Sequence, residues 1–140
     1  MNIGFRARRK TILLIDEDAH ARAALRNALE GAGFTVGEAA NDREGERTAL
    51  RVRPDAILAE LMMAHDAGKT LSERLKATGS AVPFYIVSTA ADALIGSVGL
   101  EELGISGVFL KPIDTGIVIQ TLRTRLHIGA QSERKDAAHA

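Results

Sequence analysis

The stretch PDAILAELMM, residues 54–63, decides the fold of this 140-residue chain. Its centre, residues 56–59, is a short apolar run that follows a proline and ends on the acidic residue Glu60. An apolar run of this length is typical of a strand buried on both faces, as at the centre of a parallel sheet. We therefore interpret it as the central strand of the domain.

Three other short apolar runs also end in polar side chains. They are residues 12–15 before Asp16-Glu17-Asp18, residues 84–87 before Ser88-Thr89, and residues 108–110 before Lys111-Pro112. In open α/β sheets, ligands bind just outside the carboxyl ends of the strands. If the strands are parallel, acids, hydroxyls and one lysine meet at a single edge, which is the candidate site.

Segments with helical spacing separate these runs. We expect helices at about 19–30, 42–52, 69–78, 91–103 and 115–126, and a further short strand at 34–36. Asn41-Asp42 and Asp114 are suitable N-caps for the second and last helices. Strands and helices thus alternate five times, which predicts an α/β fold with a five-stranded parallel sheet between five helices. Among the doubly wound solutions we favour the flavodoxin-like strand order 2-1-3-4-5.

The composition indicates one ordinary globular domain. Hydrophobic residues make up 46% and charged residues 26%, and 18 basic residues balance 18 acidic ones, so no net charge favours nucleic acid or acidic membrane. The absence of cysteine excludes disulfides, thiolate zinc sites and thiol nucleophiles. No apolar run approaches membrane-spanning length, and we expect a cytoplasmic protein. We expect a flexible basic lead-in at 1–10, the domain at 11–127 and a polar tail at 128–140.

Over about residues 11–126 the chain resembles the receiver domains of two-component response regulators. The resemblance is carried by ILLIDED (12–18), PDAILAELMM (54–63), PFYIVSTA (83–90) and GVFLKPID (107–114), in the family's order. It implies an acidic pocket at Asp16 and Glu17, and phosphate contacts from Ser88 and Lys111. It also places Glu60 where receivers carry the phosphoacceptor aspartate.

The chain departs from the receiver pattern at the central position, because Glu60 replaces that aspartate. Val108 stands where receivers commonly place a switching tyrosine or phenylalanine, and Ala64 stands where a loop proline is usual. The acidic pair is Asp-Glu instead of Asp-Asp, a milder change.

These departures predict altered chemistry. The extra methylene of glutamate moves its carboxylate by roughly 1.3–1.5 Å, about one C–C bond, and a displacement of about 1 Å can cost a hundredfold in rate. We therefore expect that Glu60 is not phosphorylated efficiently, and that it reaches toward Lys111 or Ser88 instead. We expect no required cofactor. A magnesium site at Asp16, Glu17 and Glu60 would be weak or absent, with Lys111 as the competing cation.

The leading hypothesis is a stand-alone receiver that acts as a protein-interaction module and is not an enzyme. Its partner would be a histidine kinase, an effector, another signalling protein or a second copy, docked on residues 91–103, 108–110 and 115–126. One alternative is a phosphorylatable receiver with weak acceptor chemistry. Another is a phosphatase resembling the haloacid dehalogenases, with Asp16 as nucleophile and Asp18 as general acid. Nucleic-acid binding through residues 6–10 ranks last.

Overall fold

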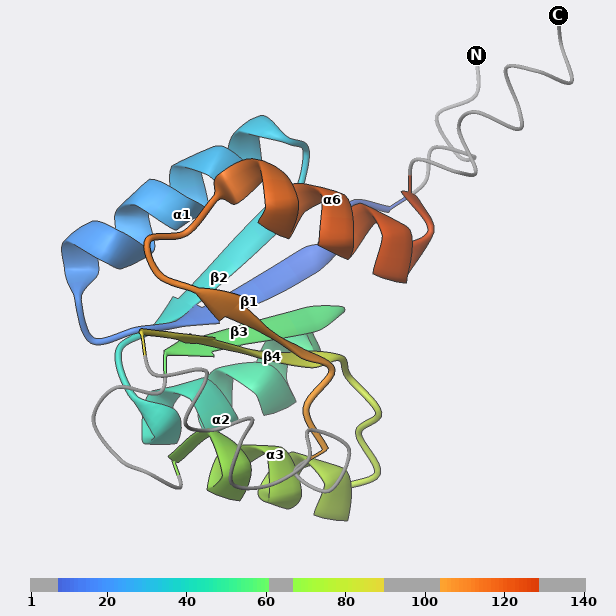
Figure 1. Ribbon diagram of the computed structural model, residues 1–140. Helices are drawn as coiled ribbons and strands as arrows, with labels where there is room; N and C mark the ends of the chain where they lie inside the picture. Colours follow the sequence, from blue (N-terminus) through green and yellow to red (C-terminus); the bar gives the residue numbers. More distant parts are fainter. Residues whose placement is uncertain (1–7, 61–66, 90–103, 129–140) are drawn as a thin grey trace, which may run out of the picture.

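Five strands and four helices are present in the part of the chain that the computed structural model describes, residues 8–60, 67–89 and 104–128 (Figure 1). The strands are β1 (Thr11–Ile15), β2 (Thr35–Ala39), β3 (Ala56–Glu60), β4 (Phe84–Ser88) and β5 (Gly107–Leu110). The helices are α1 (Ala19–Gly31), α2 (Asp42–Val52), α3 (Ala67–Ala77) and α6 (Thr115–Leu126).

All five strands are parallel and lie in the order β2-β1-β3-β4-β5, which confirms the predicted order. The register aligns their carboxyl ends. Ile15 lies opposite both Ala39 and Ala59, Glu60 lies opposite Val87, and Ser88 lies opposite Leu110. The residues that end or follow the strands therefore meet at one edge of the sheet.

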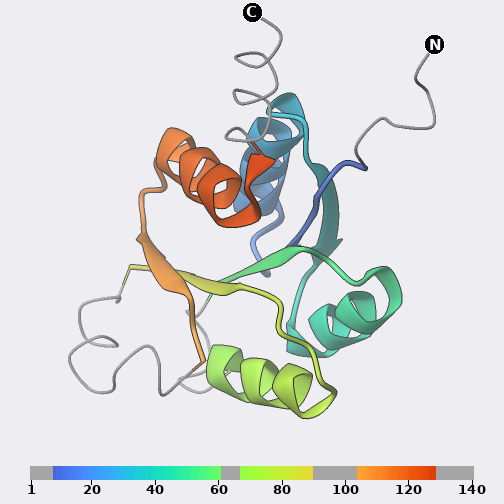
Figure 2. The same ribbon diagram turned by 90° about the vertical axis from the view of Figure 1, so that its right-hand side faces the viewer.

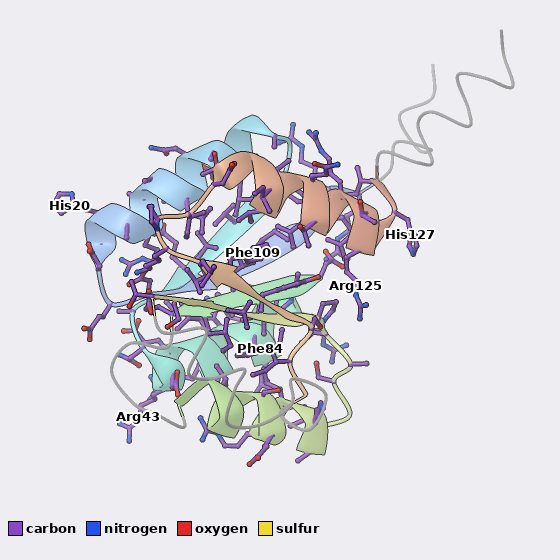
Figure 3. The ribbon with its side chains drawn as sticks, viewed as in Figure 1. His20, Arg43, Phe84, Phe109, Arg125 and His127 are labelled. Atoms are coloured by element: carbon purple, nitrogen blue, oxygen red, sulfur yellow. The ribbon has the colours of Figure 1, made fainter. Side chains whose placement is uncertain are left out.

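The helices form one layer on each face of the sheet (Figures 1 and 2). Helices α1 and α6 cover one face, and α2 and α3 cover the other. Successive strand residues point to opposite faces, so Leu58 belongs to the core under α1 and α6, whereas Ile57 belongs to the core over α2 and α3. Phe109 and Phe84 are divided between the two cores in the same way (Figure 3). This double burial explains why β3 reads as a continuous apolar run.

Side-chain caps fix where three of the helices begin. The Asn41 side chain accepts a hydrogen bond from the Glu44 N–H at the start of α2, and that of Asp114 accepts from the Ile117 N–H at the start of α6. Both caps were predicted from the sequence. The Asp18 side chain caps the start of α1 by accepting from the His20 and Ala21 N–H groups. Gly33, after the end of this helix, has a φ of +99°, the left-handed conformation that favours glycine.

The predicted boundaries of two elements, β2 and α3, were wrong. Strand β2 covers Thr35–Ala39 instead of 34–36, because Gly37 and Glu38 continue the ladder without adding apolar character. Helix α3 begins at Ala67, two residues before the predicted start. The predicted helix at 91–103 and the loop residue Ala64 lie outside the described residues.

Leu58 provides a direct test of this packing, because its side chain is 2% exposed at the centre of the sheet. We expect Leu58→Ala to lower the free energy of unfolding by about 2–5 kcal/mol, since it removes buried methyl groups and leaves a cavity. Leu50 on α2 is 52% exposed, so Leu50→Ala should change stability by less than about 0.5 kcal/mol. Urea denaturation measures both, and equal losses would contradict the core described here.

Candidate functional site

The carboxyl edge of the sheet brings the candidate residues together. Glu60 ends β3, Ser88 ends β4, and Asp16 and Lys111 directly follow β1 and β5. Backbone hydrogen bonds extend the sheet to these positions, because the Lys111 N–H donates to the Ser88 carbonyl at 3.2 Å and the Asp16 N–H donates to the Ala39 carbonyl at 3.0 Å. The site is therefore positioned by the sheet itself.

An ion pair between Glu60 and Lys111 lies at the centre of this edge. The Glu60 side chain is 5% exposed, and its Oε2 atom contacts Lys111 Nζ. The same ammonium lies 3.9 Å from Asp16 Oδ2, so two carboxylates from neighbouring strands face one cation. The contact between Glu60 and Lys111 is the one expected from the longer glutamate side chain.

Burial and neighbouring charges act in opposite directions on the pKa of Lys111. Burial by itself lowers the pKa of Lys111, but the hydrogen bond and charge of Glu60, with the charges of Asp16 and Asp18, outweigh it and raise that pKa. The second oxygen, Glu60 Oε1, is buried without a hydrogen-bond partner among the described residues. A cavity of about 30 Å³ beside Glu60 has room for one or two water molecules.

The predicted acidic pocket is divided between two environments. Asp16 is half-buried and its Oδ1 atom accepts a hydrogen bond from the Asp18 N–H at 2.8 Å, whereas Glu17 is exposed. The Asp18 carboxylate accepts hydrogen bonds from the backbone of Ala21 and His20, which hold its pKa below the usual value. Asp18 is thus the N-cap of α1.

The residues predicted as magnesium ligands do not fit such a site. Asp16, Glu17 and Glu60 form no metal-binding cluster, and no group of three acidic or histidine side chains does so in the described ranges. The Glu60 carboxylate contacts the ammonium of Lys111 instead.

Two further predicted positions, Ser88 and Val108, lie on the neighbouring strands β4 and β5. Ser88 is 3% exposed at the end of β4. Val108 on β5 is partly buried and packs against the core over α2 and α3. The Lys111–Pro112 peptide bond that follows is cis.

Arg22 on α1 belongs to this edge and was not singled out from the sequence. Its guanidinium donates to the Asp16 carbonyl and, through Nε, to Glu38 Oε1 at 2.9 Å. Arg26 donates to the other oxygen of Glu38 at 2.6 Å. The hydrogen bond from Arg22 lowers the pKa of Glu38, although burial opposes it. No local pattern reveals this network, because Arg22 and Glu38 are 16 residues apart in different elements.

Comparison with known proteins identifies the family. Residues 12–123 match the family model described as the response regulator receiver domain. The chain belongs to this family. It is thus a receiver domain with the flavodoxin-like fold of two-component signalling proteins.

Curated relatives of the receiver include two proteins named response regulator MprA. The one from Mycobacterium leprae is 31% identical over 130 residues, which are 92% of this chain and 55% of the relative. The one from Mycolicibacterium vanbaalenii is 30% identical over 115 residues, which are 82% of this chain and 49% of the relative. The chain therefore spans about half the length of these relatives.

Solved structures show the same fold. The N-terminal domain of an uncharacterized protein from Wolinella succinogenes has a TM-score of 0.75 at 27% identity, over 89% of this chain and 99% of that one. The chemotaxis response regulator CheY4 of Vibrio cholerae has a TM-score of 0.71 at 21% identity, over 84% and 98%. None of the receiver's described helices is long and apolar enough to cross a membrane.

The ion pair predicts how Lys111 titrates. A raised pKa in the folded receiver means that this group adds stability below its unfolded pKa, near 10.4. That stability should be lost as the pH rises through the higher folded value. We expect Glu60→Gln to lower the pKa of Lys111 relative to the native protein. The variant removes the negative charge that raises this pKa, whereas burial, which lowers it, remains.

NMR titration of the Lys111 side chain measures this pKa directly. Asp18→Asn is the matched control, since it removes the most weakly acting of the three acids and keeps an oxygen for the helix cap. The control should shift the pKa of Lys111 less than Glu60→Gln does. Equal shifts in the two variants would contradict a dominant Glu60–Lys111 contact.

Proposed function

We propose that this receiver is a protein-interaction module in a signalling pathway, and that its output does not depend on aspartyl phosphorylation. One observation supports this most strongly. Glu60, which the resemblance places at the family's phosphoacceptor position, is buried in contact with Lys111, the residue that resembles the family's phosphate-binding lysine. The side chain at the acceptor position and the lysine expected to bind phosphate are therefore in contact with each other.

The chemistry of receivers explains why this contact opposes phosphorylation. In the family, a carboxylate attacks phosphorus in line, while the lysine and a hydroxyl bind the transferred oxygens. Here the Glu60 side chain is longer by one C–C bond, about 1.5 Å, and its carboxylate contacts the lysine directly. The negative charge that a phosphoryl group would bring to Lys111 is supplied from within the chain.

The position of the family's aromatic switch supports a constant output. Val108 is partly buried against the core over α2 and α3. A valine has one χ angle and no ring to move between buried and exposed positions. The rotation by which an aromatic residue would report phosphorylation is therefore not available to this side chain.

The described part of the α6 and β5 surface has the character of an interaction face. Leu110 and Ile117 are each 56% exposed, so two large apolar side chains are accessible on this surface. Beside them, Tyr85, Thr121 and Arg125 help to line a shallow depression of about 440 Å³. A histidine kinase, an effector or a second copy of the chain are the partners that we propose for this face.

The two alternative functions have less support. A receiver with weak acceptor chemistry would need Glu60 to leave Lys111 before it could attack. A phosphatase that uses Asp16 and Asp18 would need Asp18 to donate a proton, but its pKa is lowered by backbone hydrogen bonds and its side chain caps α1. A lowered pKa leaves less of the protonated acid at neutral pH.

Intact-mass measurement after incubation with acetyl phosphate and magnesium chloride tests the proposal. We expect the native protein to remain unmodified and Glu60→Asp to gain one phosphoryl group, transferred from acetyl phosphate to the shorter carboxylate with release of acetate. Removing one methylene moves the acceptor back by about 1.5 Å and withdraws it from Lys111.

Glu60→Gln is the control for this experiment, because it keeps the side-chain length and removes the nucleophile. It should gain no mass. Modification of the native protein at Glu60 would overturn phosphorylation-independence. An unmodified Glu60→Asp variant would contradict the claim that the length of the glutamate blocks the acceptor.

A further inference from the structure

A basic groove runs along the opposite edge of the sheet, where the strands begin. It consists of two adjoining depressions of about 370 and 470 Å³, which share Leu75, Ser80 and Val82. The groove lies around the connection from α3 to β4, far along the strands from Glu60. Its lining comes from α2, α3, β4, the residues just before β5 and the last turn of α6.

Three cations line this groove without a carboxylate to balance them. They are Arg53 after α2, Lys76 in α3 and Arg125 in α6, the last of which is labelled in Figure 3. No acidic residue is among the lining side chains, and none of the three cations forms an ion pair within the described ranges. Elsewhere in the described ranges Arg22, Arg26, Arg74 and Lys111 form ion pairs, whereas exposed cations such as Arg51 do not.

The position of the helices explains part of this concentration of charge. The carboxyl ends of α3 and α6 lie at this edge, and their exposed carbonyls favour nearby cations. The Lys76 side chain is exposed, but its Nζ atom lies so close to Gly104 that a β-carbon there would overlap it. Gly104 has a φ of +72°, a conformation that favours glycine, and the absence of a side chain at this residue leaves space for the Lys76 ammonium. The ammonium therefore lies against the chain at the groove.

Hydroxyl groups add hydrogen-bond donors to the groove. Ser80 Oγ accepts from the Val82 N–H at 3.4 Å, and Ser106 Oγ accepts from the Phe84 N–H at 3.3 Å. Each hydroxyl acts there as an acceptor, and its own O–H donates to no described residue. Apolar side chains supply the rest of the lining, among them Leu75, Val82, Phe84 and Ile105.

We infer that this groove binds a small organic phosphate, a phosphate group attached to an apolar or aromatic body. Lys76 and Arg125, with the hydroxyls of Ser80 and Ser106, would hold the phosphate, and the apolar lining would contact the organic part. Charge-assisted hydrogen bonds of this kind are the strong ones. The volume of each depression lies within the range of small-molecule sites, about 300–1,000 Å³.

The distribution of charge over the domain supports an anion at this edge. The chain as a whole is neutral, and the acids Asp16, Glu17 and Glu60 gather at the other end of the strands. A cleft lined by one sign of charge concentrates the opposite ion. The groove shares Arg125 with the depression on the α6 face but no residue with the Glu60 edge, so nucleotide binding and phosphorylation at residue 60 are tested separately.

Titration of the ¹⁵N-labelled protein with adenosine monophosphate tests the inference. We expect amide shifts at Ser80, Val82 and Ser106. Adenosine should produce little change, and inorganic phosphate should bind more weakly than the nucleotide. Lys76→Gln and Arg125→Gln should each weaken binding about five- to tenfold, as expected for one charged hydrogen bond.

Arg51→Gln is the matched control, because Arg51 is an exposed cation in the last turn of α2 that lines neither depression. It should bind the nucleotide as the native protein does. The inference is overturned if no shifts appear at low ionic strength, or if they appear around Ser88 and Lys111 instead. Equal weakening in Arg51→Gln would also overturn it, because binding would then follow overall charge and not the groove.

Discussion

The buried contact between Glu60 and Lys111 is the interaction on which the candidate site depends. Removing two charges from water is costly, and their mutual attraction compensates only when they remain together. The parallel sheet keeps them together, because it ends β3 and β5 at the same edge. Removing one partner would leave an uncompensated buried charge, which destabilises a folded protein by about 3–5 kcal/mol. This cost keeps the two groups together in the folded domain.

This contact also determines what the edge can do. A receiver that signals by phosphorylation needs a carboxylate that is free to attack and a lysine that is free to bind the product. In this chain the carboxylate and the ammonium are in contact with each other, and Asp16 adds a second negative charge to the same cation at 3.9 Å. The two ends of the strands also differ in charge: the carboxyl edge carries several acids with the paired cations Arg22 and Lys111, whereas the cations that line the groove at the other end form no ion pair among the described residues.

Much of the fold was predictable because its signals are local. Burial on both faces makes β3 a continuous apolar run, and short polar side chains at Asn41 and Asp114 mark where helices begin. The full length of β2 was not predictable, because Glu38 is a charged residue within the strand. Its charge is balanced by Arg22 and Arg26 of α1, which a local sequence pattern does not reveal. The residues at the carboxyl edge could be named from the sequence because strand ends meet there. Arg22 could not, since its contacts exist only after α1 and β2 pack.

The most direct test of the Glu60–Lys111 interaction is a double-mutant cycle in the unfolding free energy, with Glu60→Gln, Lys111→Met and the double variant at neutral pH. Our account predicts a coupling energy of about 1–3 kcal/mol, because each single variant leaves a buried partner unpaired and the double variant leaves none. Additive effects, within about 0.5 kcal/mol, would contradict it and would mean that the two groups do not hold each other in the folded protein.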